Sequence, residues 1–219
     1  MSDSRNDPAA GVGRKVRLRL INCYRERTED KLEPYRQWLR IGATAAGLEL
    51  EIQSATDRDS LPGDASCDAV ILSGSHKMVG EGEIEAGLID FLRGNRRPLL
   101  GICYGHQALA RAFGARVKKD ERKHIGEETI RVGTTEGLFS GFSGSFAMSE
   151  SHEEIVARDG GLEGEFHVLA ESGPGLVEAI RHRGRPLYGV QFHPERSGEL
   201  GVRLLANFLN AIPDARRRG

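Results

Sequence analysis

One cysteine of this chain stands in a setting that favours nucleophilic chemistry. Cys103 follows the apolar run Leu99–Ile102 and lies between Gly101 and Gly105. Gly-x-Cys-x-Gly is the thiol form of the nucleophile elbow, in which a strand turns sharply into a helix and presents one side chain at the apex. Because such a turn crowds the backbone, the residues two positions before and after the nucleophile must be small. The pattern therefore predicts that Cys103 is a nucleophile.

A second segment offers the partners that a cysteine nucleophile needs. His193 lies ninety residues after Cys103, and Glu195 follows it after one proline. A free thiol, with a pKa of about 8.5, is mostly protonated at neutral pH, and a helix N-terminus favours the thiolate. His193 would accept the thiol proton and pass it to a leaving amine, and Glu195 would orient the imidazole. These three residues are the expected catalytic triad.

The group attacked should be a carbonyl, because an oxyanion hole can form beside the cysteine. The backbone N–H of Tyr104, directly after the nucleophile, is one expected donor. The second comes from the loop at Gly74 and Ser75, which follows the expected strand Ala69–Ser73. Donors aimed at a developing oxyanion typically contribute about a hundredfold or more to the rate.

The elements that must position these residues alternate between short apolar runs and amphipathic stretches. Periodicity predicts strands and helices in the order of an open parallel sheet with helices on both faces, and sites in such sheets gather at the carboxyl ends of the strands. The expected strands are Val16–Cys23, Leu48–Ile52, Ala69–Ser73 and Pro98–Cys103, and the expected helices Glu33–Ala46, Ile84–Arg93 and Gly105–Phe113. After Ala115, strand-like pieces predict an additional antiparallel segment: Glu128–Val132, Ser145–Met148, His167–Glu171, Leu176–Arg181 and Pro186–Gln191, before a final helix Gly198–Ala211. The fold class is therefore α/β.

Composition bounds the class of protein. The 219 residues fit one domain, expected over residues 15–213, between a disordered lead at 1–14 and a basic tail at 214–219. The 31 basic and 32 acidic residues nearly cancel, so no global field favours a nucleic acid or a membrane surface. No apolar run approaches the roughly 20 residues of a membrane span, and no signal peptide is evident. Three cysteines without metal-type spacing indicate reduced thiols in a cytoplasmic protein. We expect neither a metal nor an organic cofactor.

The other reactive side chains have simpler interpretations. Cys23 and Cys67 are expected to be small buried hydrophobes, and His106 to support the elbow helix. The charged run from Val117 to Lys123 is expected to be a solvated face. Surface or loop positions are expected for the four histidines His76, His124, His167 and His182.

Together the two segments, Gly-Ile-Cys-Tyr-Gly-His-Gln and Gly-Val-Gln-Phe-His-Pro-Glu, resemble the class I, triad-type glutamine amidotransferases. The resemblance implies a flavodoxin-like fold and hydrolysis of L-glutamine through a cysteine γ-glutamyl thioester, with ammonia delivered to a synthetase. It implies that Cys103, His193 and Glu195 are catalytic, and that Tyr104 and the Gly74–Ser75 loop line the oxyanion hole.

The same resemblance implies substrate-binding residues. Gln107 would help to hold glutamine, and the segment Ser149–Glu154, with Ser151, His152 and Glu153 at its centre, would hold the α-amino and α-carboxylate groups through its backbone. Within the family, Val177–Ile180 and Leu187–Glu195 are most similar to the glutaminase domain or subunit of GMP synthetase. The chain has no nucleotide-binding fingerprint, so amination of an acceptor would need a separate synthetase subunit.

Two features leave other functions open. Ser73-Gly74-Ser75 stands where the synthetase usually has Ser-Gly-Gly-Pro, and it resembles the loop of the γ-glutamyl peptidases, which cleave larger γ-glutamyl compounds without a partner. The charged stretch Asn22–Arg27 replaces an asparagine- and glycine-rich turn of the family. A third hypothesis, a non-catalytic regulatory subunit, conflicts with the intact Cys-His-Glu set.

Overall fold

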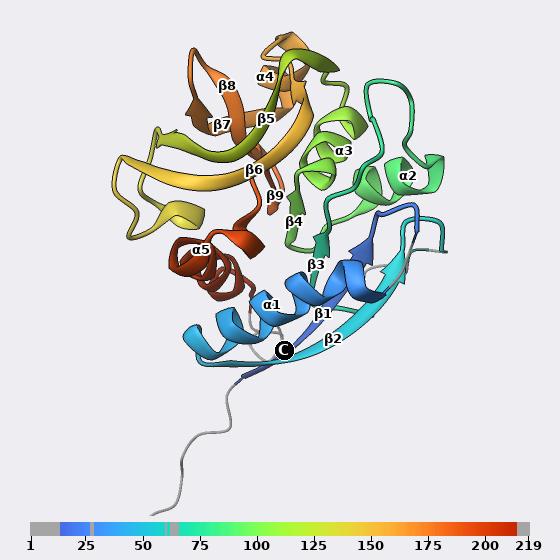
Figure 1. Cartoon of the computed structure of the whole chain (residues 1–219). Coiled ribbons are helices and arrows are strands. Elements are labelled where there is room, and N and C mark those ends of the chain that lie inside the picture. Colours follow the sequence, from blue (N-terminus) through green and yellow to red (C-terminus); the bar gives the residue numbers. More distant parts are fainter. Residues whose placement is uncertain (1–13, 27–28, 60, 62–65, 214–219) are drawn as a thin grey trace, which may run out of the picture.

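The computed structural model describes residues 14–26, 29–59, 61 and 66–213. Its strands are β1 (Arg14–Asn22), β2 (Leu48–Thr56), β3 (Ala69–Leu72), β4 (Leu99–Ile102), β5 (Val117–Val132), β6 (Ser145–Val156), β7 (Phe166–Ser172), β8 (Leu176–His182) and β9 (Leu187–Val190). Its helices are α1 (Glu33–Ala45), α2 (Ala86–Gly94), α3 (Tyr104–Ala112), α4 (Gly160–Glu165) and α5 (Gly198–Asn210), with short 3-10 turns η1 (Glu29–Leu32), η2 (Gly137–Phe139) and η3 (Pro194–Arg196). Among the described residues the strands join in one sheet, in the order β2-β1-β3-β4-β9-β8-β7-β5-β6 (Figure 1).

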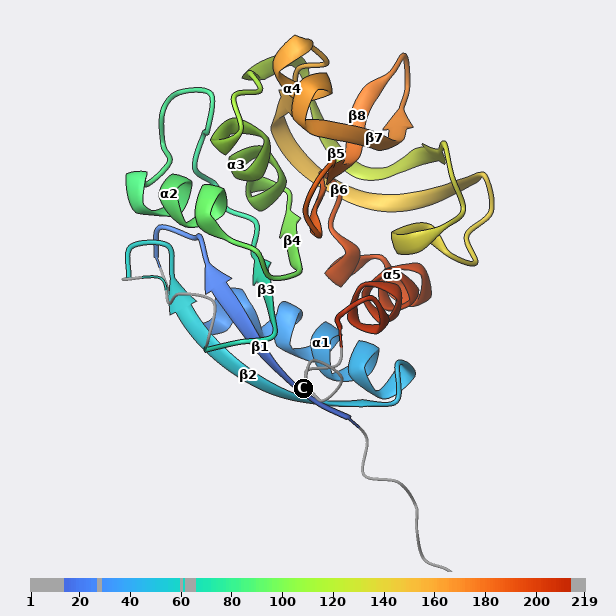
Figure 2. The ribbon, with the colours of Figure 1, turned by 180° about the vertical axis from the view of Figure 1, so that it is seen from behind.

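The half of the sheet from β2 to β9 is parallel, and helices cover both of its faces. The alternation of side chains along β3 shows how: Ala69 and Ile71 face a core shared with α1 and α5, whereas Val70 and Leu72 face a core shared with α2 and α3. Residues that alternate across a strand point to opposite faces, so a fully apolar strand indicates a sheet buried on both sides. Figures 1 and 2 show the two helix pairs on opposite sides of these strands.

The other half of the sheet is antiparallel and begins at β9, which pairs with β4 on one side and β8 on the other. The expected α/β class with an antiparallel segment is confirmed, and that segment continues the same sheet. The largest differences from the expected strand lengths are in this half: β5 begins at Val117 and β6 extends to Val156. Their polar residues lack a clear apolar alternation, but cross-strand pairing holds them in the ladder. Most side chains of the charged run 117–123 are exposed, as expected.

The first strand begins earlier than expected and takes in Arg14, the last residue of the expected lead. The Arg14 guanidinium donates a hydrogen bond to the Ile212 carbonyl (2.8 Å), which joins β1 to the segment after α5. The rest of the expected lead, residues 1–13, and the expected tail, residues 214–219, lie outside the described residues. Within the described part of the chain, no helix combines the length and apolar character that crossing a bilayer requires.

Candidate active site

Three neighbouring parallel strands end at the same edge of the sheet, and the candidate functional residues follow these strands in the chain. The loop with Gly74 and Ser75 comes after β3, Cys103 comes after β4, and His193 comes shortly after β9. Because β3, β4 and β9 are adjacent and parallel, their carboxyl ends bring these segments together. The candidate residues of three separate segments therefore lie at one edge of the sheet.

Cys103 forms the expected sharp turn between β4 and α3. Its φ is +50°, and it has the only positive φ of a non-glycine residue in the described part of the chain. Both flanking glycines are sterically required. A Cβ on Gly101 would lie 2.4 Å from the carbonyl oxygen of Gly105, and one on Gly105 would lie 2.8 Å from the Cβ of Leu72. The small residues therefore allow the elbow to pack against its own strand and against β3.

His193 and Glu195 form a buried pair after β9. Nδ1 of His193 donates to Oε1 of Glu195 at 2.7 Å, and the Glu195 side chain is 0% exposed. The backbone N–H of His193 donates to the Ser149 carbonyl (2.8 Å), which ties the turn to β6. Burial by itself would lower the pKa of His193, but its interactions with Cys103 and Glu195 outweigh burial and raise that pKa to about 10. The protonated imidazolium form of His193 is thus favoured by its two neighbours.

A cavity of about 210 Å³ opens beside the cysteine. Its lining includes Cys103 together with four of the expected substrate-binding residues and one residue of the expected oxyanion loop: Gln107, Ser151, His152, Glu153 and Ser75. The Cys103 Sγ lies 3.9 Å from the Ser151 carbonyl oxygen, which faces it from β6. The structure therefore brings the sequence-derived candidates around one small, mixed polar and apolar space.

Several side chains around this cavity are engaged within the protein. Nε2 of Gln107 donates to the Glu154 carbonyl (2.9 Å) and to Oε1 of Gln191 (3.1 Å). Glu153 forms ion pairs with Lys123 (2.6 Å) and Lys119 (3.4 Å) on β5. His152 contacts the same Glu154 carbonyl. These contacts hold the cavity wall in place. They could not be predicted from the sequence, because they depend on the register between strands.

The backbone amides near the cysteine differ in their availability. The N–H of Gly74 donates to the Tyr35 hydroxyl at 2.8 Å. A Cβ on Gly74 would lie 3.2 Å from Cε1 of His193, so the loop passes directly beside the imidazole. Within the described residues, the amides of Ser75 and Tyr104 have no hydrogen-bond acceptor. Tyr104 lies in the first turn of α3, where N–H groups have no partner inside the helix.

Two residues at the site were not among the expected functional residues. Tyr35 lies in α1, and its hydroxyl accepts a hydrogen bond from the Gly74 amide. Lys77 lines the cavity, forms a buried ion pair with Asp57, and places its ammonium group 5.4 Å from the centre of the Tyr104 ring. The only sequence signal for Lys77 was its position in the loop after β3.

The remaining histidines and cysteines differ in whether their exposure matches the expectation. His76 and His167 are exposed, as expected, and Cys23 and Cys67 are buried, also as expected. The expectation of surface or loop positions was wrong for His124 and His182, which are 3% and 7% exposed within β5 and β8. Sheet pairing covers them, which a charged sequence environment does not reveal. His106 is buried against Gly189, and burial lowers its pKa to about 3, consistent with a packing role.

Comparisons with known proteins identify the family of this chain. The family model for "Glutamine amidotransferase class-I" matches residues 30–212. The chain is 33% identical over 158 residues to one subunit of the glutamine-hydrolysing GMP synthase of Methanococcus aeolicus, covering 72% of this chain and 80% of that one. It is 31% identical over 176 residues to the GMP synthase of Francisella philomiragia, covering 80% of this chain but only 33% of that protein's length.

A solved structure gives the same result at the level of the fold. The crystal structure of a Thermoplasma acidophilum protein assigned as a GMP synthase subunit superposes with a TM-score of 0.72 and 26% identity, covering 89% of this chain and 92% of that one. The family match spans the elbow at Cys103 and the His193–Glu195 turn. On this evidence, the chain belongs to the class I glutamine amidotransferase family.

Proposed function

We propose that this chain hydrolyses L-glutamine to glutamate and ammonia, with Cys103 as the nucleophile, His193 as the proton-transfer group and Glu195 as its orienting partner. The observation that carries the proposal is the +50° φ of Cys103 beside the buried His193–Glu195 pair. A non-glycine residue held in such a conformation costs on the order of 1–3 kcal/mol, and this strain is found where a side chain must be presented for chemistry. Membership of the glutamine amidotransferase family supports the same reaction.

The proposed reaction uses the thiolate that faces the His193 imidazolium. The sulfur attacks the γ-carbonyl carbon of glutamine, and the carbonyl electron pair moves onto the oxygen. When the tetrahedral intermediate collapses, the C–N bond breaks and His193 gives its proton to the departing ammonia, leaving a γ-glutamyl thioester on Cys103. Neutral His193 then removes a proton from water, which attacks the thioester. Glutamate leaves and the thiolate–imidazolium pair is restored.

The oxyanion of both intermediates needs backbone donors. The amides of Ser75 and Tyr104 are the proposed donors, because neither has another acceptor among the described residues. The Gly74 amide, also expected in this role, is bonded to the Tyr35 hydroxyl, so its use would require that bond to be exchanged for one to the substrate. The carbonyl of Ser151 and the neighbouring backbone of β6 line the space for the α-groups of glutamine.

Ammonia is proposed to pass to a synthetase on a separate polypeptide. The name of the Methanococcus aeolicus relative, which is one subunit of a glutamine-hydrolysing GMP synthase, supports a partner of this kind. Such a glutaminase is expected to turn over slowly alone and faster when its partner is bound, since many sites are completed only by closure or assembly.

The decisive experiment measures ammonia and glutamate released from glutamine by the purified chain and by Cys103→Ala. We expect the variant to lose at least about 10³-fold in kcat, since the covalent step is removed. Cys67→Ala is the matched control, because it removes another buried thiol, outside the cavity, and should retain activity. Substantial turnover in a folded Cys103→Ala protein would show that the triad assignment is wrong.

A γ-glutamyl dipeptide, assayed in parallel, separates the two enzymatic hypotheses. A glutaminase that serves a synthetase should leave the dipeptide intact. Cys103-dependent cleavage of the dipeptide that is faster than glutamine hydrolysis would instead identify a free-standing γ-glutamyl peptidase.

A further inference from the structure

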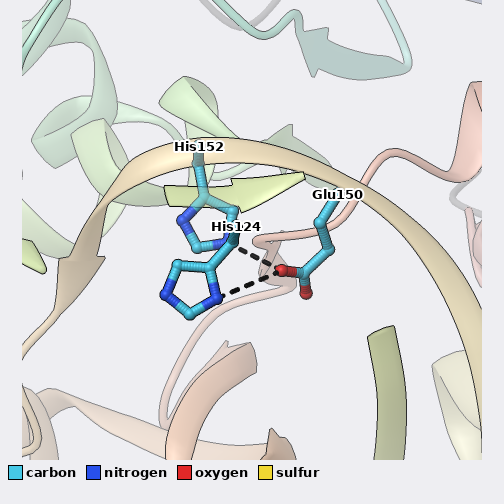
Figure 3. A group of neighbouring side chains, drawn as sticks. All are labelled: His124, Glu150 and His152. Carbon is cyan, nitrogen blue, oxygen red and sulfur yellow. Dashed lines mark hydrogen bonds and ion pairs between the residues drawn. The ribbon is translucent and has the colours of Figure 1, made fainter. Parts of the chain in front are cut away.

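Three buried side chains from neighbouring strands converge beside the cavity. Glu150 and His152 lie two residues apart on β6, so they share one face, and His124 on β5 is directly opposite His152 in the antiparallel register. The side chains of His124, Glu150 and His152 are 0%, 1% and 2% exposed. Figure 3 shows both imidazoles directed toward the Glu150 carboxylate. The sheet thus brings two imidazoles and one carboxylate close together.

Each imidazole is oriented through its outer nitrogen. Nδ1 of His152 lies 2.9 Å from the Glu154 carbonyl oxygen, which can only accept, so Nδ1 carries a hydrogen and Nε2 faces Glu150. Nε2 of His124 lies 2.7 Å from the Asp120 carboxylate, which leaves Nδ1 on the side of Glu150. Histidines that bind metals characteristically donate their other N–H to a carbonyl or a carboxylate, because this fixes the tautomer and the ring orientation.

The inward-facing atoms are not fully satisfied by one another. Nε2 of His152 is 2.9 Å from Oε2 of Glu150, whereas Nδ1 of His124 is 3.9 Å from the same oxygen. Nδ1 of His124 is buried without a hydrogen-bond partner in the described chain, whereas the Glu150 carboxylate also interacts with the buried Glu178 carboxyl group. Buried polar atoms are normally paired, so an unpaired imidazole nitrogen aimed at a carboxylate points to a missing positive group between them.

We propose that His124, Glu150 and His152 bind one divalent transition-metal ion of the zinc class through Nδ1, Oε2 and Nε2. One potential ligand atom from each residue lies within 4.8 Å of the others. Two imidazoles with one carboxylate suit Zn²⁺, Co²⁺ or Ni²⁺, whereas Mg²⁺ and Ca²⁺ prefer oxygen ligands. The rings are now stacked with centres 4.6 Å apart and planes 3° from parallel, so binding requires them to tilt toward a common point.

The ion's place in the fold defines its effect. It joins β5 to β6 next to the register shift between Lys119 and His124, where the strand ladder is interrupted. His152 also lines the cavity, and its neighbour Ser151 faces Cys103. A bound ion would therefore brace the cavity wall that carries these residues, without contacting the reacting sulfur.

The test measures metal binding in the Cys103→Ala background, because the Cys103–His193 pair could itself ligate zinc. Equilibrium dialysis against Zn²⁺ with elemental analysis, and titration with Co²⁺ followed by its visible absorption, should give one ion per chain. Glu150→Gln and His124→Gln should each weaken binding at least about 100-fold, and Asp120→Asn about 10-fold or more through loss of ring orientation. His182→Gln is the matched control, a buried histidine outside the cluster.

Thermal unfolding supplies a second readout and a check that each variant folds. Saturating Zn²⁺ should raise the Tm of the parent and of His182→Gln but not that of Glu150→Gln, since only a ligand bound to the native state stabilises it. The absence of stoichiometric Zn²⁺ or Co²⁺ binding to the folded parent would overturn the proposal, as would equal affinity in a folded Glu150→Gln protein. In either case the site would be a proton-sharing cluster only.

Discussion

Cys103 illustrates how much of the site is decided within a few residues. The sulfur sits at the N-terminus of α3, where the helix dipole favours an anion, and the imidazole that faces it has a raised pKa. The positive φ places the side chain toward the cavity, and the glycines on either side remove the clashes that the turn would otherwise create. Local sterics thus direct the Cys103 sulfur toward the cavity, and local electrostatics favour a negative charge on it.

The titration of His193 tests this pairing directly. Against the opposing effect of burial, the interactions with Cys103 and Glu195 raise the pKa of His193 to about 10. In Cys103→Ala one negative neighbour is lost, so we expect the pKa of His193 to fall toward the ordinary histidine value of about 6.5. Nitrogen-15 chemical shifts of the imidazole, followed from pH 5 to 11, measure it. If the pKa stays near 10 in the variant, the thiolate is not the partner that holds the proton.

At the scale of elements, the close approach of α5 to the His193–Glu195 turn positions the proposed catalytic pair. Gly201 in α5 packs against η3, and a Cβ there would lie 1.8 Å from the Pro194 carbonyl oxygen. Trp38 of α1 donates to the Gly201 carbonyl at 2.9 Å, so three elements meet at this glycine. No side chain larger than hydrogen fits without moving the turn.

Gly201→Ala is therefore expected to lower both stability and activity. Overpacking should lower the free energy of unfolding by about 1–3 kcal/mol, and displacement of His193 should reduce kcat on the order of 10- to 100-fold. Gly87→Ala in α2 is the control, since nothing lies within 4 Å of a Cβ there and alanine should stabilise the helix by about 0.5–1 kcal/mol. Urea unfolding and glutaminase assays measure both effects. Equal stability of the two variants would contradict the close approach.

At the scale of the whole molecule, the parallel and antiparallel halves share β9 and both cores, one on each face of the sheet. The core beneath α1 and α5 includes Leu18 and Ile71 from the parallel half and Phe146 and Met148 from β6. Neither half can lose its packing without exposing apolar surface of the other. From this continuity we propose a single domain, the organisation predicted for residues 15–213.

Unfolding of the chain should accordingly be one cooperative transition. Trp38, the single tryptophan and a buried residue of α1, reports on the parallel half, and amide hydrogen exchange in β5 and β6 reports on the antiparallel half. We expect both probes to give the same urea midpoint, as for a two-state domain. Loss of protection in β5 and β6 at clearly lower urea would show that the halves unfold separately.

What the sequence could predict depends on the distance between the interacting residues along the chain. The apolar runs at Ala69–Leu72 and Leu99–Ile102 indicated buried parallel strands, because a run of consecutive apolar residues is a local signal of a strand buried on both faces. The length of β5 and β6 was underestimated, since their polar residues are held by partners in the neighbouring strand. The candidates around Cys103 were identified from their motifs, but the partners of their side chains were not.

By itself, the sequence determined the α/β alternation, the elbow with its two obligatory glycines and the pairing of a histidine with a carboxylate in one short turn. These depend on sterics and chemistry within a few residues. Only the tertiary structure decided that the Gly74 amide meets the Tyr35 hydroxyl, that Gln107 supports the wall behind the cavity, and that His124 lies opposite His152. Such contacts arise from strand register and helix packing, which bring together residues that no local pattern relates.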